Sequence, residues 1–125
     1  MELRLDGYGD AKVLNNAEYL VHFQRSLIAK AGMRIVWGPN IHSYKEPGLP
    51  DAGLTAFTLI AESHCVLHGW PERDGYFEFT LSSCKTFDVN KIEDYVQMAL
   101  GMRSSVRREV DPERGGPHVL AMPPL

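Results

Sequence analysis

The chain has 125 residues, a hydrophobic content of 44% and a formal net charge of −3 at pH 7. This length suits a single domain with a hydrophobic core, and we expect residues 1–125 to form one domain. Because the sequence has no run of Lys and Arg, its charge argues against an electrostatic grip on nucleic acid or on an anionic membrane. The expected partners are therefore small molecules or a second copy of the chain.

The sequence also indicates the cellular compartment. Its first residues lack a basic segment that leads into an apolar stretch, and no apolar run approaches the length of a membrane span. We therefore expect a cytoplasmic protein. The two cysteines are Cys65 and Cys84, and a chain of this size folds without disulfide bonds, so we expect both thiols to be reduced.

The first half of the chain predicts a strand, a helix and a second strand. Alternating apolar residues indicate a strand at 2–6, and apolar residues at helical spacing indicate a helix that begins at an N-cap, Asn16, and stops at Gly32. A short strand at 34–37 follows. Gly and Pro residues then predict a long loop over 38–53, and loops of that length are often functional.

The second half repeats this order. A mostly apolar run predicts a central strand at 54–61, and clean alternation predicts another at 76–81. Asp88 is placed to cap a second helix that ends near Gly101, and a last strand follows at 105–110. The expected fold is α+β: a two-layer sandwich of a mainly antiparallel sheet with two helices on one face, built from tandem strand-helix-strand units.

Residues 62–72, with the sequence ESHCVLHGWPE, concentrate reactive side chains between two predicted strands. Their alternation of polar and apolar residues is typical of a strand that presents chemistry on one face. The hydroxyl of Ser63 can attack the carbonyl of Glu62 and shift the acyl group from nitrogen to oxygen. Elimination at the serine Cα then splits the chain, and the resulting dehydroalanine hydrolyses to a pyruvoyl group, whose carbonyl forms a Schiff base with an amine substrate and accepts its electrons.

This motif resembles that of the small prokaryotic S-adenosylmethionine decarboxylases, which carry Glu-Ser-His, then His-x-Trp-Pro-Glu, then a cysteine. The resemblance covers most of the chain and is strongest over 54–84. It implies a pyruvoyl-dependent enzyme of polyamine and spermidine biosynthesis that cleaves itself into residues 1–62 and 63–125. It further implies a homodimer of cleaved protomers with active sites near the interface.

The resemblance also assigns roles to individual residues. It implies that Ser63 becomes the pyruvoyl group after cleavage of its bond to Glu62, and that His68 removes the serine Cα proton during processing. It also implies that the hydroxyl of Thr55 supports the same step. Cys84 would return a proton to the substrate carbon after carbon dioxide leaves, a step that needs a positioned acid.

Substrate contacts follow from the same resemblance. Tyr44 and Trp70 would sandwich the adenine, since flat aromatic faces suit a flat base and attract the neighbouring sulfonium charge. The carboxylate of Glu72 would accept the two ribose hydroxyls. By contrast, we expect His64 to be structural or orienting and Cys65 to be a small core residue.

Three alternatives remain open at this point. The same pyruvoyl chemistry in a changed pocket would act on ornithine or arginine. A homologue that keeps the fold without cleaving itself would be a binding or regulatory subunit. A zinc site made of His42, His64, His68 and Cys84 is disfavoured, because two histidines four residues apart on a strand are separated by about 13 Å; we therefore expect no resident metal.

Overall fold

The structure is a computed structural model that describes residues 1–45 and 52–111. In chain order its elements are β1 (Glu2–Tyr8), α1 (Ala11–Leu14), α2 (Ala17–Lys30), β2 (Ile35–Tyr44), β3 (Gly53–Ile60), β4 (Ser63–Trp70), β5 (Tyr76–Ser83), α3 (Val89–Leu100) and β6 (Ser104–Val110). The strands form one sheet in the order β2-β3-β4-β5-β1-β6. Every neighbouring pair in this order is antiparallel.

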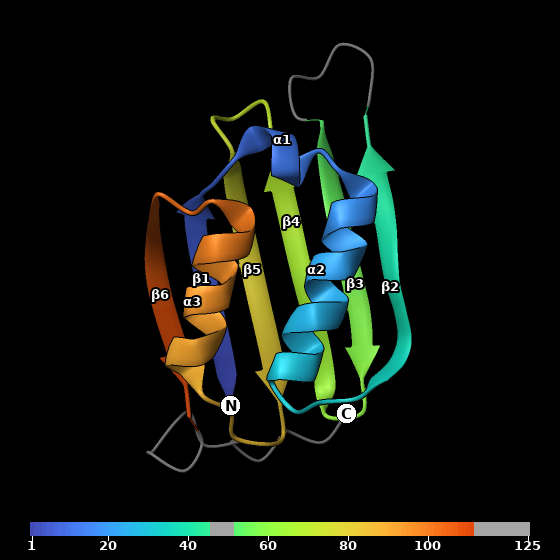
Figure 1. Cartoon of the computed structure of the whole chain (residues 1–125), viewed down its shortest axis with the longest axis vertical. Coiled ribbons are helices and arrows are strands. Elements are labelled where there is room, and N and C mark those ends of the chain that lie inside the picture. Colours follow the sequence, from blue (N-terminus) through green and yellow to red (C-terminus); the bar gives the residue numbers. More distant parts are fainter. Residues whose placement is uncertain (46–51, 112–125) are drawn as a thin grey trace, which may run out of the picture.

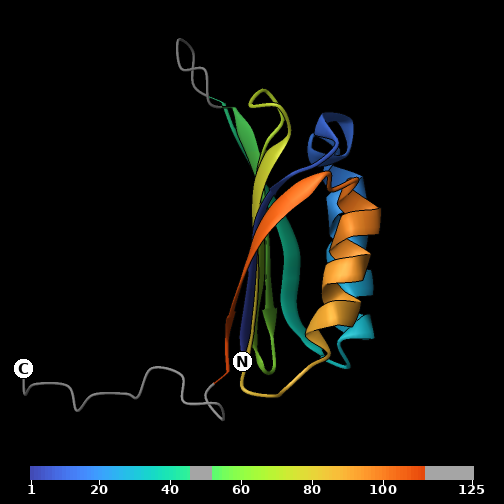
Figure 2. The ribbon, with the colours of Figure 1, turned by 90° about the vertical axis from the view of Figure 1, so that its left-hand side faces the viewer.

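The two long helices, α2 and α3, lie side by side on one face of this sheet (Figures 1 and 2). Each follows a strand and returns the chain to a further strand, as the tandem strand-helix-strand pattern predicts. The predicted α+β two-layer sandwich is therefore confirmed.

Local signals explain where the helices begin and end. The side chain of Asn16 accepts a hydrogen bond from the backbone N–H of Tyr19, and that of Asp88 accepts one from Lys91. These N-caps satisfy backbone donors that have no partner within the helix. Gly101 ends α3 in the left-handed conformation, with φ of 61°, which glycine adopts without steric cost.

The core lies between the helices and the facing side of the sheet. Alternate residues of β1, β3, β4 and β5 point into it, so side chains two apart on a strand share this face. Cys65 is one of them, and burial raises the pKa of its thiol. The prediction that Cys65 is a core residue is confirmed. The largest fully buried side chains are Phe23, Phe77, Phe79, Leu3, Leu5, Leu14, Leu20, Leu27, Ile28, Leu67, Leu81 and Ile92.

The sequence-based prediction was wrong about β2. This strand continues to Tyr44 through the Gly38–Pro39 pair, whose peptide bond is cis, with irregular register between Ile35 and Asn40. Proline is tolerated here because β2 is an edge strand with bulges. The loop predicted over 38–53 is therefore shorter, and its central residues, 46–51, lie outside the described part of the chain. The short helix α1 was not predicted.

The opposite side of the sheet, here called the open face, is not covered by any element within residues 1–45 and 52–111 (Figure 2). Strand register and alternation place on it six exposed apolar or aromatic side chains: Tyr8, Trp37, Tyr44, Leu59, Val106 and Val110. None of the helices in the described ranges is long and apolar enough to cross a membrane.

Candidate active site

The residues of the 62–72 motif lie along β4 and in the turns at its two ends. One end holds the Glu62–Ser63 peptide bond and Cys84, and is here called the serine end. The other end holds Thr55, His68 and Trp70, and is here called the aromatic end.

At the serine end, a tight turn between β3 and β4 presents the Glu62–Ser63 bond at the margin of the sheet. The backbone N–H of Cys84 donates a hydrogen bond of 2.9 Å to the carbonyl oxygen of Glu62. The hydroxyl of Ser63 lies 3.1 Å from Nδ1 of His64. Cys84 is an exposed, free thiol just after β5. Its neighbour Ser83 pairs with Ser63 across the two strands. The fold thus brings the Ser63 hydroxyl, the His64 imidazole and the backbone N–H of Cys84 together at the peptide bond that the motif singles out.

The side chain of Glu62 is held as a carboxylate at this turn. Its Oε1 accepts a hydrogen bond of 3.1 Å from the backbone N–H of Arg34, and its Oε2 lies 3.4 Å from the Nζ of Lys85. The hydrogen bond from Arg34 is the main cause that lowers the pKa of Glu62; the charge and hydrogen bond of Lys85 lower it further, and burial opposes them. Glu62 therefore ties the serine end to the start of β2 and to the segment after β5.

This lowered pKa predicts a pH-dependent contribution of Glu62 to stability. The contribution is complete above the unfolded-state pKa and is lost as the pH falls through the lower native-state pKa. In a Ser63→Ala background, which keeps the chain intact, we expect Glu62→Gln to be less stable at neutral pH. The gap from its parent should shrink on acidification, and urea unfolding midpoints at a series of pH values measure it. A gap independent of pH contradicts the ionic role.

At the aromatic end, the hydroxyl of Thr55 lies 2.9 Å from Nδ1 of His68. The two residues face each other across β3 and β4 on the open face. The ring of His68 lies 6.1 Å from that of Trp70, between centroids. A cavity of about 200 Å³ adjoins this pair and is lined by Tyr44, Gly53, Leu54, Thr55, His68, Gly69 and Trp70. The structure therefore brings together two predicted processing residues and two predicted substrate contacts.

The strand register places a row of aromatic side chains across the open face, and this row includes the aromatic end. Tyr44 pairs with Gly53, Trp70 pairs with Tyr76, and Tyr76 pairs with Tyr8. Because Gly53 has no side chain, the row has a gap between Tyr44 and Trp70. Tyr76 was not among the predicted site residues. Its place at the start of a predicted strand, directly after the turn that follows Trp70, is the signal that could have identified it.

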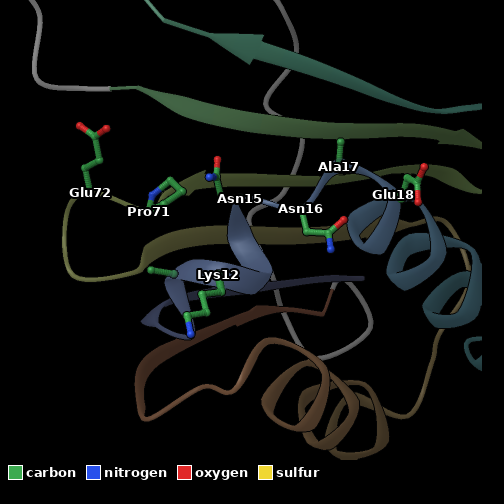
Figure 3. A pocket seen from close by; sticks show the side chains of 8 residues that line it. Lys12, Asn15, Asn16, Ala17, Glu18, Pro71 and Glu72 are labelled. Carbon is green, nitrogen blue, oxygen red and sulfur yellow. The ribbon is translucent and has the colours of Figure 1, made fainter.

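Glu72 lies beside this end, on the turn between β4 and β5. It lines a smaller cavity together with Tyr44 and Gly53. On its other side is an open groove of about 630 Å³ formed by Pro71, Glu72 and the α1–α2 segment (Figure 3). The side chain of Glu72 is exposed. The structure thus places Glu72 near Tyr44, as the substrate-binding hypothesis requires.

The two ends do not meet within one chain. Ser63 and His68 are five residues apart on the extended strand β4, which separates their Cα atoms by about 16 Å. A side chain cannot span that distance to remove a proton from Ser63. Among the described residues there is also no group of three or more His, Cys, Asp or Glu side chains placed to hold a metal ion.

Comparisons with known proteins decide the family. The family model described as S-adenosylmethionine decarboxylase matches residues 2–113. The chain belongs to the S-adenosylmethionine decarboxylase family. The resemblance to this family seen in the sequence is therefore confirmed.

Individual members of the family are distant relatives. An S-adenosylmethionine decarboxylase proenzyme of Clostridium botulinum (strain Hall) is 30% identical over 98 residues, which is 78% of each chain. A proenzyme of the same name from Pyrobaculum arsenaticum is 33% identical over 78 residues, or 62% of this chain and 58% of that one. The crystal structure of the adenosylmethionine decarboxylase from Aquifex aeolicus VF5 matches with a TM-score of 0.63 at 20% identity, over 86% of this chain and 84% of that one. This structural match supports the fold.

Proposed function

We propose that the chain is a self-processing, pyruvoyl-dependent decarboxylase that converts S-adenosylmethionine into decarboxylated S-adenosylmethionine for polyamine biosynthesis. The observation that carries the proposal is the Glu62–Ser63 bond, which lies in a tight turn with its carbonyl oxygen hydrogen-bonded to the Cys84 N–H. The naming of the relatives as proenzymes supports it, since a proenzyme is a precursor that must be processed.

The geometry of the serine end fits the formation of a pyruvoyl group. When the hydroxyl of Ser63 attacks the Glu62 carbonyl carbon, negative charge develops on the oxygen that already faces the Cys84 N–H. The C–N bond then breaks and leaves an ester between Glu62 and the Ser63 side chain. Loss of the Ser63 Cα proton to a base expels the Glu62 carboxylate and yields residues 1–62 and 63–125, the latter with a dehydroalanine at position 63. This residue tautomerises to an imine, takes up water and releases its nitrogen as ammonia, which leaves the pyruvoyl group. The group that forms from residue 63 supplies an electrophilic carbonyl that binds a substrate amine and withdraws the electrons released by decarboxylation.

The distance between the two ends supports a homodimer. We propose that two protomers pack open face to open face, with strands running in opposite directions, so that the aromatic end of one lies against the serine end of the other. His68 and Thr55 of the second protomer then act at the Glu62–Ser63 bond, which lies at the margin of the sheet where β4 begins, and each site needs both copies. The exposed Trp37, Leu59 and Val106 on this face favour burial against an apolar surface.

The aromatic end supports binding of the adenosine part of the substrate. The gap at Gly53 lies between the Tyr44 and Trp70 positions of the row, and a planar base between two aromatic rings is stabilised by stacking. Glu72 shares a cavity with Tyr44 and supplies acceptors for ribose hydroxyls.

We propose Cys84 as the acid that protonates the substrate carbon after decarboxylation, because its backbone N–H bonds the carbonyl of the bond that is cut and its thiol is free and exposed. We expect Cys84→Ala to cleave itself but to turn over roughly 10²- to 10⁴-fold more slowly, the usual loss for a general acid. Its pyruvoyl group should also be damaged by misplaced protonation. Denatured mass and carbon dioxide release measure the two effects. Cys65→Ala, which alters only the buried thiol, is the control, and a fully active Cys84→Ala enzyme contradicts the role.

The substrate is tested by offering S-adenosylmethionine, ornithine and arginine, each labelled in the carboxyl group, to the purified protein. Release of labelled carbon dioxide from S-adenosylmethionine alone is expected. Release from arginine or ornithine instead would keep the pyruvoyl chemistry and overturn the substrate. A chain that neither cleaves itself nor releases carbon dioxide would be a non-catalytic homologue.

A further inference from the structure

We propose that Tyr76 is a positioning residue that holds the indole of Trp70 so that one indole face is presented to an adenine-type ring in the gap at Gly53. This inference rests on the proposed function and extends it to a residue outside the 62–72 motif. Tyr76 reaches the site from β5, whereas the predicted contacts Tyr44 and Trp70 come from β2 and β4.

The contact between the two rings carries the argument. Trp70 and Tyr76 are cross-strand partners, and their rings are stacked with centroids 5.5 Å apart and planes 25° apart. The stacked Tyr76 ring occupies one indole face, and Gly53 lies on β3, on the other side of β4 from Tyr76. A Cβ atom built on Gly53 would lie 2.6 Å from the Gly69 carbonyl oxygen and 3.5 Å from Cδ1 at the edge of the Trp70 indole, so the indole borders the gap. The indole orientation therefore depends on Tyr76.

Tyr76 is itself fixed by further contacts. The ring of Tyr8 lies 5.5 Å from that of Tyr76 on the other side. The Tyr76 hydroxyl donates a long hydrogen bond of 3.4 Å to Oε1 of Glu78, whose Oε2 lies 2.6 Å from a guanidinium nitrogen of Arg4. Burial, followed by the charges of Glu78 and Asp6, raises the pKa of Tyr76, so the hydroxyl stays a donor at neutral pH. This chain of contacts anchors the ring that orients Trp70.

The test measures nucleoside binding apart from catalysis. In a Trp37→Phe background, Trp70 is the single tryptophan, and its fluorescence is titrated with 5′-methylthioadenosine, which keeps the adenosine of the substrate and lacks its amino acid. We expect Tyr76→Val and Tyr76→Leu to weaken binding roughly three- to tenfold, the range of one aromatic stacking contact. The KM for S-adenosylmethionine should rise by a similar factor with kcat little changed. Tyr76→Phe keeps the stack and the contact with Tyr8 and loses only the long hydrogen bond to Glu78, so it should weaken binding less than either aliphatic replacement.

Tyr19→Leu is the matched control, because Tyr19 lies on the helix side and bonds the Ala99 carbonyl. Self-cleavage of each variant shows that it has folded. Two replacements at position 76 are used so that, if one of them does not fold, the other still tests the role of Tyr76. Unchanged binding and KM in a folded Tyr76→Val or Tyr76→Leu variant would overturn the role of Tyr76 alone. Absence of nucleoside binding by the parent would overturn the substrate assignment as well, which separates the two failures.

Discussion

Replacing Ser63 with Ala is expected to leave a single intact chain with no decarboxylase activity. The change removes the one hydroxyl that can attack the Glu62 carbonyl from the next residue, so neither the ester nor the pyruvoyl group forms. The unmodified protein should instead give two fragments, residues 1–62 and 63–125. The second fragment should carry the mass of a pyruvoyl group in place of serine. Denaturing mass spectrometry of both proteins makes the comparison directly.

Ser82→Ala is the matched control for this experiment. Ser82 is also a half-buried strand serine near the serine end, and it pairs with His64. It should cleave and turn over like the unmodified chain. An active Ser63→Ala enzyme would refute the mechanism, and an uncleaved parent would show that this chain keeps the fold without the chemistry.

Much of the fold could be predicted because its signals are local. The N-cap side chains of Asn16 and Asp88 satisfy backbone donors within three residues, and the stop at Gly101 needs only a conformation that glycine tolerates. Alternation along β5 shows directly which side chains enter the core. The extension of β2 through Pro39 could not be predicted in this way, because proline is compatible with a strand only if that strand lies at an edge, and edge position is a property of the whole sheet.

The same distinction explains what the sequence revealed of the site. Ser63, His68 and Trp70 stand within eight residues of one another and belong to one motif, residues 62–72. A strand is extended, however, so residues that are only five to seven positions apart along it lie far apart in space. Conversely, Tyr76 joins Trp70 only through the register of the β4–β5 hairpin, and Cys84 reaches the Glu62 carbonyl only through the end of β5. The residue types were therefore enough to predict the chemistry, whereas the contacts between these residues could be seen only in the fold.

Because Ser63 and His68 lie at opposite ends of β4, we expect that two variants that cannot cleave themselves restore cleavage when they are combined. We expect Ser63→Ala and His68→Ala each to remain uncleaved when expressed alone. When they are co-expressed, a mixed dimer contains one complete site, formed by Ser63 of the His68→Ala chain and His68 of the Ser63→Ala chain. The His68→Ala chain should then be cut, up to about half of it if equal amounts pair at random. Masses of the tagged chains identify which one is cleaved.

The alternative is a site contained within one chain, and the experiment separates the two. In that case the purified mixed dimer would contain no chain with both residues correctly placed, and neither protein would be cut. Cleavage of His68→Ala on its own would remove His68 from processing altogether. Pairing Ser63→Ala with Ser63→Ala/His68→Ala is the negative control, because no combination in that dimer supplies the hydroxyl. Rescue restricted to the complementary pair would establish that the second protomer completes the site, because about 16 Å of strand separates Ser63 from His68 in each chain.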